Sequence, residues 1–167
     1  LDRELIDELW KNDPEMQQLA QQYDERPVNR ILSRKINEFD NSIPHNVAQR
    51  QFDMIRQIAD SGESAIFVGR CADYALAGRP GLLRIFCRAD LGQRIRRIEQ
   101  RHNLSKKKAA LLVAKTDRHR KVYYHHHTGQ FWGHSSCYDL TVNTGVLGVE
   151  KTAETMEAFI RTFWEQD

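Results

Sequence analysis

The chain has 167 residues, of which 40% are hydrophobic and 29% charged, a composition that excludes a disordered or fibrous protein. No apolar run approaches the roughly 20 residues of a membrane-spanning helix, and no signal-peptide pattern is present. The net charge of +2 indicates no particular partner, and Cys71, Cys87 and Cys137 have no metal-binding spacing, so we expect reduced thiols in a cytoplasmic protein.

The first part of the chain is predicted to be helical. Apolar residues recur at helical spacing over residues 2–11, and a second helix is expected over residues 14–23, where Pro14 occupies the first helical position. Residues 44–61 form an amphipathic pattern, and Gly62 is well placed to end it.

After Gly62 the pattern changes to short apolar segments that alternate with helices. Buried strands are predicted at residues 64–68, 82–87 and 138–143. Helices are predicted at residues 72–77, 90–102, 105–124 and 149–164. This alternation is typical of βαβ units, in which the strands are parallel and share one sheet.

The pair Gly69–Arg70 directly follows the first predicted strand. Ligands of open parallel sheets bind outside the carboxyl ends of the strands. A glycine there permits close approach of the backbone, and an arginine can bind phosphate through two parallel hydrogen bonds. The alternative is a surface arginine in a loop.

Positive charge is concentrated over residues 94–121, where eleven Lys or Arg residues accompany only Glu99 and Asp117. The segment is either a solvated helix face or an anion-binding surface for nucleotide phosphates or nucleic acid. Nucleic acid is disfavoured because no recognised binding motif accompanies the charge. Arg118 and Arg120, with Asp117 beside them, could converge on the phosphates of a phosphoryl-transfer site.

The histidine run His125, His126 and His127, with His134 and Cys137 nearby, is a tempting metal site. Adjacent residues point in different directions, however, and no carboxylate or cysteine pair completes a known metal spacing. We therefore predict no metal here and expect solvated or packing histidines.

An aromatic, glycine-punctuated segment leads into the last predicted strand. It comprises Tyr123–Tyr124, residues 128–133 (Thr-Gly-Gln-Phe-Trp-Gly) and residues 138–143 (Tyr-Asp-Leu-Thr-Val-Asn). Together with residues 69–74 (Gly-Arg-Cys-Ala-Asp-Tyr), this pattern resembles the cytidylate kinase-like family of nucleoside monophosphate kinases.

The resemblance implies a P-loop NTPase-type three-layer α/β/α fold, helix-rich and with a parallel sheet, in one domain over residues 1–167. Residues 1–62 would form the acceptor-binding helical region and residues 115–135 a lid. Leu1–Asp2 resembles the end of the second strand of such kinases, so the first strand and the Gly-rich phosphate loop would precede it. No Gly-x4-Gly-Lys-Ser/Thr occurs in the sequence, and we expect the given chain to lack its beginning.

The implied reaction is transfer of the γ-phosphoryl group of ATP to a pyrimidine monophosphate such as cytidylate, with Mg²⁺ bridging the donor phosphates. The resemblance places Arg118, Arg120 and Asp117 at the reacting phosphates, and Asp2, Arg70, Asp73, Arg94 and Arg97 at the bound nucleotides. The aspartate that follows the arginine in cytidylate kinases is Cys71 here, and Asp73 is its nearest substitute. Tyr124 and Trp132 are expected to pack within the lid.

The absent phosphate loop and Cys71 also motivate an alternative, a catalytically inactive kinase-like module that binds nucleotides or regulates a partner. A basic domain that binds nucleic acid is a third, weaker reading. The sequence specifies neither the acceptor nucleotide nor the oligomeric state.

Overall fold

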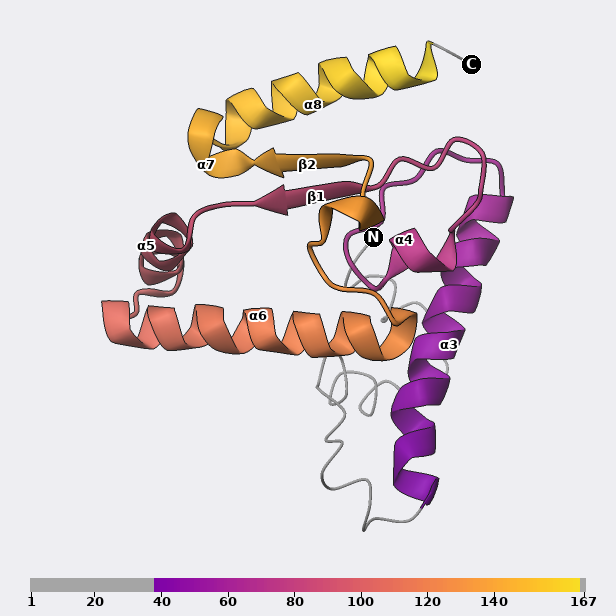
Figure 1. Cartoon of the computed structure of the whole chain (residues 1–167), viewed down its shortest axis with the longest axis horizontal. Coiled ribbons are helices and arrows are strands. Elements are labelled where there is room, and N and C mark those ends of the chain that lie inside the picture. The colour runs from indigo at the N-terminus through magenta and orange to yellow at the C-terminus, as the bar shows by residue number, and fades with distance from the viewer. Residues whose placement is uncertain (1–37, 166–167) are drawn as a thin grey trace. The chain divides into compact units, whose positions relative to one another are not determined.

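The computed structural model describes residues 38–165 (Figure 1). This part of the chain is rich in helices and contains a parallel sheet of two strands, so it is an α/β structure. The three-layer arrangement of a P-loop NTPase stays a prediction, as does a single kinase-like domain over residues 1–167. The predicted helices at 2–11 and 14–23 lie outside the described residues.

The chain divides into two compact units: Leu1–Leu82 with His119–Trp132, and Leu83–Arg118 with Gly133–Asp167. The first unit contains the helices α3 (Glu38–Asp60) and α4 (Ala72–Ala75). Its core cluster consists of the buried residues Phe52, Ile55, Cys71, Ala72, Ala75, Leu76 and Tyr124. The Arg56 Nε atom donates to the backbone oxygen of Ala75 at 3.2 Å and so ties α4 to α3. Helix α3 begins at Glu38 and not at Pro44, while Gly62 follows its end with a φ of +80°, in agreement with its predicted role as a stop.

Residues 64–68 form no strand, so the prediction of a buried strand there is wrong. Ile66 is 81% exposed and Val68 56% exposed. The sheet of the described residues is formed by two other segments, β1 and β2. The apolar composition of residues 64–68 therefore predicted neither strand pairing nor the burial of Ile66 and Val68.

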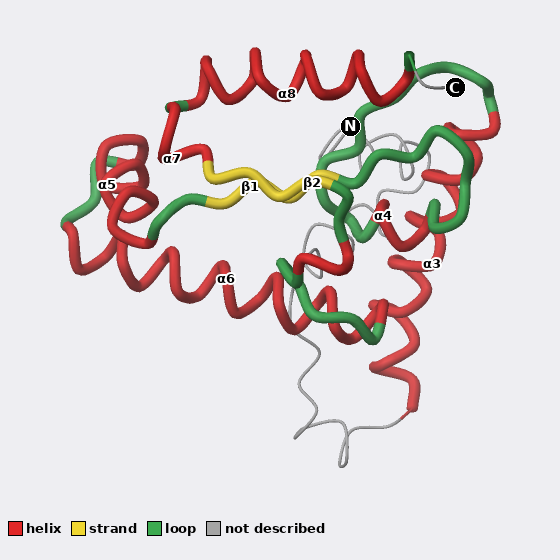
Figure 2. The backbone as a smooth tube through the Cα atoms, turned by 45° about the horizontal axis from the view of Figure 1, so that its top comes forward, coloured by secondary structure: helices red, strands yellow, loops and turns green. Residues whose placement is uncertain are grey.

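The second unit holds the sheet, formed by β1 (Ile85–Arg88) and β2 (Leu140–Asn143). Figure 2 shows the two strands side by side, and they run parallel, with Ile85 opposite Leu140. The predicted strands at 82–87 and 138–143 and their parallel direction are thus confirmed, although both begin a few residues later than predicted. The parallel connection between them passes through the helices α5 (Leu91–His102) and α6 (Lys106–Thr128).

The entry to the sheet is fixed by Arg84 and Asp139, which immediately precede the two strands. The Asp139 carboxylate accepts hydrogen bonds from Arg84 Nη2 at 2.7 Å, from Arg84 Nε at 3.0 Å and from the Arg84 backbone N–H at 2.8 Å. In return the Asp139 backbone N–H donates to the Arg84 oxygen at 2.8 Å. These hydrogen bonds hold the pKa of Asp139 below its ordinary value, and the side-chain bond from Arg84 contributes most. Partial burial of the carboxylate opposes this lowering.

Local sequence signals explain the remaining helices. Asp90 and Gln93 form a capping box at the start of α5. Helix α6 runs on to Thr128, beyond its predicted end at Tyr124, so the histidine run is helical. Helix α8 (Val149–Trp164) has the predicted bounds. The short helix α7 (Thr144–Leu147) and the 3-10 helix Ser135–Cys137 were not predicted. None of the helices in the described part is long and apolar enough to cross a membrane.

Candidate active site

Three successive residues with positive φ angles form the turn that carries Arg70. The φ angles are 75° at Gly69, 58° at Arg70 and 53° at Cys71. The turn is closed by the Ala72 N–H, which donates to the Gly69 oxygen at 3.1 Å. Each non-glycine residue in this conformation costs about 1–2 kcal/mol. Strain of this kind persists where the surrounding structure enforces it, and it is concentrated at functional sites.

This turn places Arg70 inside the first unit and not on its surface. Arg70 is only 6% exposed, whereas the sequence left open a surface arginine in a loop. Taking a guanidinium out of water costs several kcal/mol before its interactions are counted, and its positive charge is permanent. The turn therefore keeps a fixed positive charge inside the unit, three residues before Asp73.

Asp73 lies on α4, directly after the turn, and its carboxylate is bound by Tyr124 of α6. The Tyr124 hydroxyl donates to Asp73 Oδ2 at 2.6 Å. Tyr124 itself is 5% exposed and belongs to the core cluster, and Trp132 packs against that cluster. Both aromatic residues thus pack on the core cluster of the first unit, whereas their packing within a lid stays a prediction, and the bond from Tyr124 to Asp73 was not foreseen.

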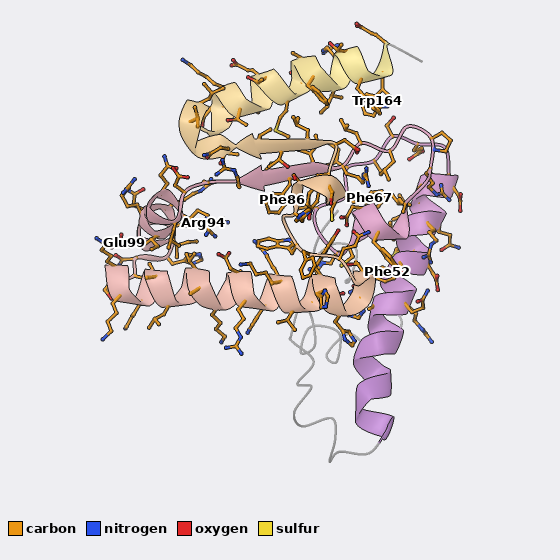
Figure 3. All side chains as sticks on the ribbon, in the orientation of Figure 1. Phe52, Phe67, Phe86, Arg94, Glu99 and Trp164 are labelled. Carbon is orange, nitrogen blue, oxygen red and sulfur yellow. The ribbon has the colours of Figure 1, made fainter. Side chains whose placement is uncertain are left out.

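In the second unit, Arg94 of α5, labelled in Figure 3, forms an ion pair with Asp117 of α6. The Arg94 Nη1 atom lies 2.8 Å from each carboxylate oxygen of Asp117. The Arg94 Nε atom also donates to the backbone oxygen of Ala89 at 3.1 Å. Two of the predicted site residues are therefore brought together, and each fixes the direction of the other.

The other predicted cations lie on the surface. Arg97 of α5 and Arg118 and Arg120 of α6 are all exposed, as an anion-binding or a solvated face requires. The hypothesis that Arg118 and Arg120 share one cleft with Arg70 stays a prediction, and so does the lid over residues 115–135. Asp2, the remaining predicted site residue, lies outside the described part of the chain.

The carboxyl end of the sheet is organised by Gln93. Its Nε2 atom donates to the Gly145 oxygen at 3.0 Å, and its Oε1 atom accepts from the Asp90 N–H at 3.3 Å. The Thr144 hydroxyl donates to the Arg88 oxygen at 3.2 Å and links the ends of the two strands. Val146, which follows on α7, is 74% exposed. Ligands of parallel sheets bind at this end.

The histidine run is used in packing. His127 contacts Phe52 and Tyr123, with ring centroids 6.1 and 4.4 Å apart, and His125 stacks on Phe131 at 5.3 Å. No group of three His, Cys, Asp or Glu side chains that could hold a metal gathers in the described residues.

Comparison with known proteins decides the family. The sequence model of the cytidylate kinase-like family matches residues 1–146. The chain belongs to this family. A structure search also finds the crystal structure of an uncharacterized protein from Eubacterium ventriosum, which is 30% identical in sequence and superposes with a TM-score of 0.67. The match covers 70% of this chain and 73% of that chain. No curated protein matches.

Among the contacts of this cytidylate kinase-like chain that escaped the sequence analysis, two join residues far apart in the sequence. Tyr124 and Asp73 lie 51 residues apart and Arg84 and Asp139 lie 55 apart, so no local pattern joins them. The second pair could have been found once the strands were taken as parallel, because Arg84 and Asp139 each precede a strand by one residue. The first pair has no comparable signal.

Proposed function

We propose that this protein is a nucleoside monophosphate kinase that transfers the γ-phosphoryl group of ATP to a pyrimidine monophosphate, with cytidylate as the first candidate. Membership of the cytidylate kinase-like family supports the reaction class. The observation that carries the proposal is the strained turn at Gly69–Cys71, which keeps the buried cation of Arg70 three residues before the carboxylate of Asp73. In this proposal the cation of Arg70 binds the phosphate of one nucleotide, and the carboxylate of Asp73, three positions later in the sequence, accepts a hydrogen bond from a polar group of the same nucleotide.

The chemistry needs positioning and charge neutralisation more than it needs a protein nucleophile. An oxygen of the acceptor phosphate attacks the γ-phosphorus in line, and the leaving oxygen stays on ADP. In this proposal Arg70 binds the acceptor phosphate, and Arg118 and Arg120 stabilise charge on the moving phosphoryl group. Arg94, aimed by Asp117, and Arg97 bind the outer phosphates of the nucleotides.

ATP and Mg²⁺ are the cofactors that such a kinase would use. The exposed arginines of α5 and α6, Arg97 and Arg118 among them, are donors of the kind that polyphosphate requires. Mg²⁺ is usually held by substrate phosphates and water together with one or two carboxylates, and it neutralises phosphate charge when bound. Asp117 is the acidic residue next to Arg118, but its carboxylate is committed to Arg94.

The test is phosphoryl transfer by the full-length protein with ATP, Mg²⁺ and a panel of monophosphates, CMP, dCMP, UMP, AMP and GMP. Arg70→Lys retains the charge but loses the planar fork of donors. We expect it to weaken CMP binding about 10- to 100-fold, which corresponds to the roughly 1.5–3 kcal/mol of a charged hydrogen bond. The matched control is Arg79→Lys, a surface arginine of the same unit that binds Asp60, which should bind CMP normally.

A nucleotide-binding module without kinase activity is the second candidate, because Cys71 is buried and stands where cytidylate kinases have an aspartate. Calorimetry separates the two. Tight binding of CMP or ATP by the intact protein, with no transfer to any monophosphate, would favour the module and exclude the kinase. Wild-type affinity for CMP in Arg70→Lys would remove Arg70 from the site.

A further inference from the structure

The hydroxyl group of Tyr124 is buried in the first unit and held there by hydrogen bonds. The residue is 5% exposed within an otherwise apolar cluster that includes Phe52, Ile55 and Leu76. A buried hydroxyl that lacks a hydrogen bond lowers the stability of the fold by about 1–3 kcal/mol. The partners of the Tyr124 hydroxyl therefore matter for the stability of the cluster. One partner is the Asp73 carboxylate, at the short distance of 2.6 Å typical of a bond to an ionised acceptor.

The second partner is Gln130, whose side-chain Oε1 atom lies 3.0 Å from the same hydroxyl. A phenol has one proton, and a carboxylate can only accept. With Asp73 as the acceptor at the shorter distance, the Gln130 amide has to turn so that its NH₂ group faces the Tyr124 oxygen. Thr128 links the backbone of Tyr124 to that of Gln130. Its hydroxyl donates to the Tyr124 backbone oxygen at 2.7 Å and accepts from the Gln130 N–H at 3.0 Å. The hydroxyl is thus held in one direction.

Asp73 is held from its backbone as well. It lies in α4, which starts at the strained turn and whose last residue, Ala75, accepts a hydrogen bond from Arg56 of α3. With the helix anchored and one carboxylate oxygen bound by Tyr124, the orientation of the second oxygen is fixed. That oxygen is the atom available to accept a hydrogen bond from a ligand.

We infer that Tyr124 is a positioning residue: its hydroxyl aims the Asp73 carboxylate at a hydrogen-bond donor, an amino or hydroxyl group, of the acceptor nucleotide. This inference rests on the proposed kinase function and adds to it a residue that acts through Asp73 and touches no substrate. Its contribution belongs to recognition of the acceptor, so it should appear in KM for the monophosphate and leave kcat nearly unchanged.

The experiment compares Tyr124→Phe, Asp73→Asn and the double variant in the full-length protein, with CMP as acceptor. Each single variant should raise KM for CMP about five- to tenfold with kcat within about twofold. The double variant should be no worse than Asp73→Asn alone, because the two residues act as one unit. Tyr123→Phe is the matched control: the hydroxyl of the neighbouring tyrosine donates to Gln51 at 3.5 Å, so the KM of this variant should stay at the wild-type value. Parallel series with UMP and dCMP show whether the donor is the base amino group or a ribose hydroxyl.

The outcomes separate this inference from the proposed function. An active wild type whose KM is raised by Asp73→Asn but not by Tyr124→Phe would overturn the positioning role and leave the kinase standing. Additive effects in the double variant would do the same. An inactive wild type would remove both. Should Tyr124→Phe fail to fold, Gln130→Leu removes the other partner of the hydroxyl and should raise KM about two- to threefold; a normal KM there would overturn the inference.

Discussion

Arg94 and Asp117 bind each other: one guanidinium nitrogen of Arg94 lies 2.8 Å from both carboxylate oxygens of Asp117. The sequence placed both residues at the nucleotides but gave no reason to pair them. The backbone oxygen of Ala89 fixes the opposite edge of the guanidinium. Asp117 therefore has a role that requires no contact with substrate, which is to set the direction of an arginine.

Asp117→Asn should lower kcat/KM for the monophosphate about five- to tenfold, because Arg94 loses the charged partner that directs it. Stability should change by no more than about 1 kcal/mol, since the side chains are 34% and 23% exposed. Steady-state kinetics and urea denaturation measure the two effects. Glu99→Gln is the control, because Glu99 is the other acidic residue of the cationic segment over residues 94–121. Equal losses in the two variants would show a general charge effect and no specific role for Asp117.

The contact between Arg84 and Asp139 predicts how stability depends on pH. The side-chain bond to Arg84 holds the pKa of Asp139 below its ordinary value in the folded protein. Its contribution is therefore present above the unfolded-state pKa and is lost as the pH falls through the lowered folded-state pKa. Both side chains are about one-third exposed, so we expect the contribution to be only about 1 kcal/mol.

Urea denaturation of the wild type and of Asp139→Asn between pH 7 and pH 2.5 tests this dependence. The difference in unfolding free energy should be largest near neutral pH and should shrink below about pH 4. Asp53→Asn is a suitable control, because Asp53 forms an exposed pair with Arg56 on α3 and should matter little at any pH. A difference for Asp139→Asn that stays constant over the whole range would contradict the assignment.

Two glycines of the second unit should respond to alanine in opposite ways. A methyl group on Gly145 would lie 1.9 Å from Gln93 Oε1, so Gln93 would have to move and give up both of its hydrogen bonds. We expect Gly145→Ala to destabilise the protein by about 1–2 kcal/mol. A methyl group on Gly92 meets only Arg96 Nη1 at 3.7 Å, and alanine favours a helix over glycine by roughly 0.5–1 kcal/mol. Thermal unfolding should rank Gly92→Ala at or above the wild type and Gly145→Ala below it, and the reverse order would refute the role of Gln93.

The features that the sequence predicted well are those with local signals. Helix α8 has the predicted bounds, and the capping box at Asp90 marks the start of α5; both depend on residues within a few positions of each other. Residues 64–68 carry the composition of a strand, but strand formation depends on a distant partner that composition does not identify. The same reason explains the contact between Tyr124 and Asp73, whose 51-residue separation only tertiary structure reveals.

The final prediction concerns Arg120, which lies on the exposed face of α6. If its charge acts chiefly on the moving phosphoryl group, Arg120→Ala should lower kcat at least tenfold and leave KM for CMP within about twofold, because the interaction is made mainly in the transition state. Lys121→Ala is the matched control, since it removes an adjacent exposed charge from the same helix turn and should keep more than half of the wild-type kcat. Steady-state kinetics with ATP and CMP on the full-length protein measure both variants. A normal kcat in Arg120→Ala would make Arg120 a surface charge, and a comparable loss in Lys121→Ala would assign the effect to the overall field of the helix.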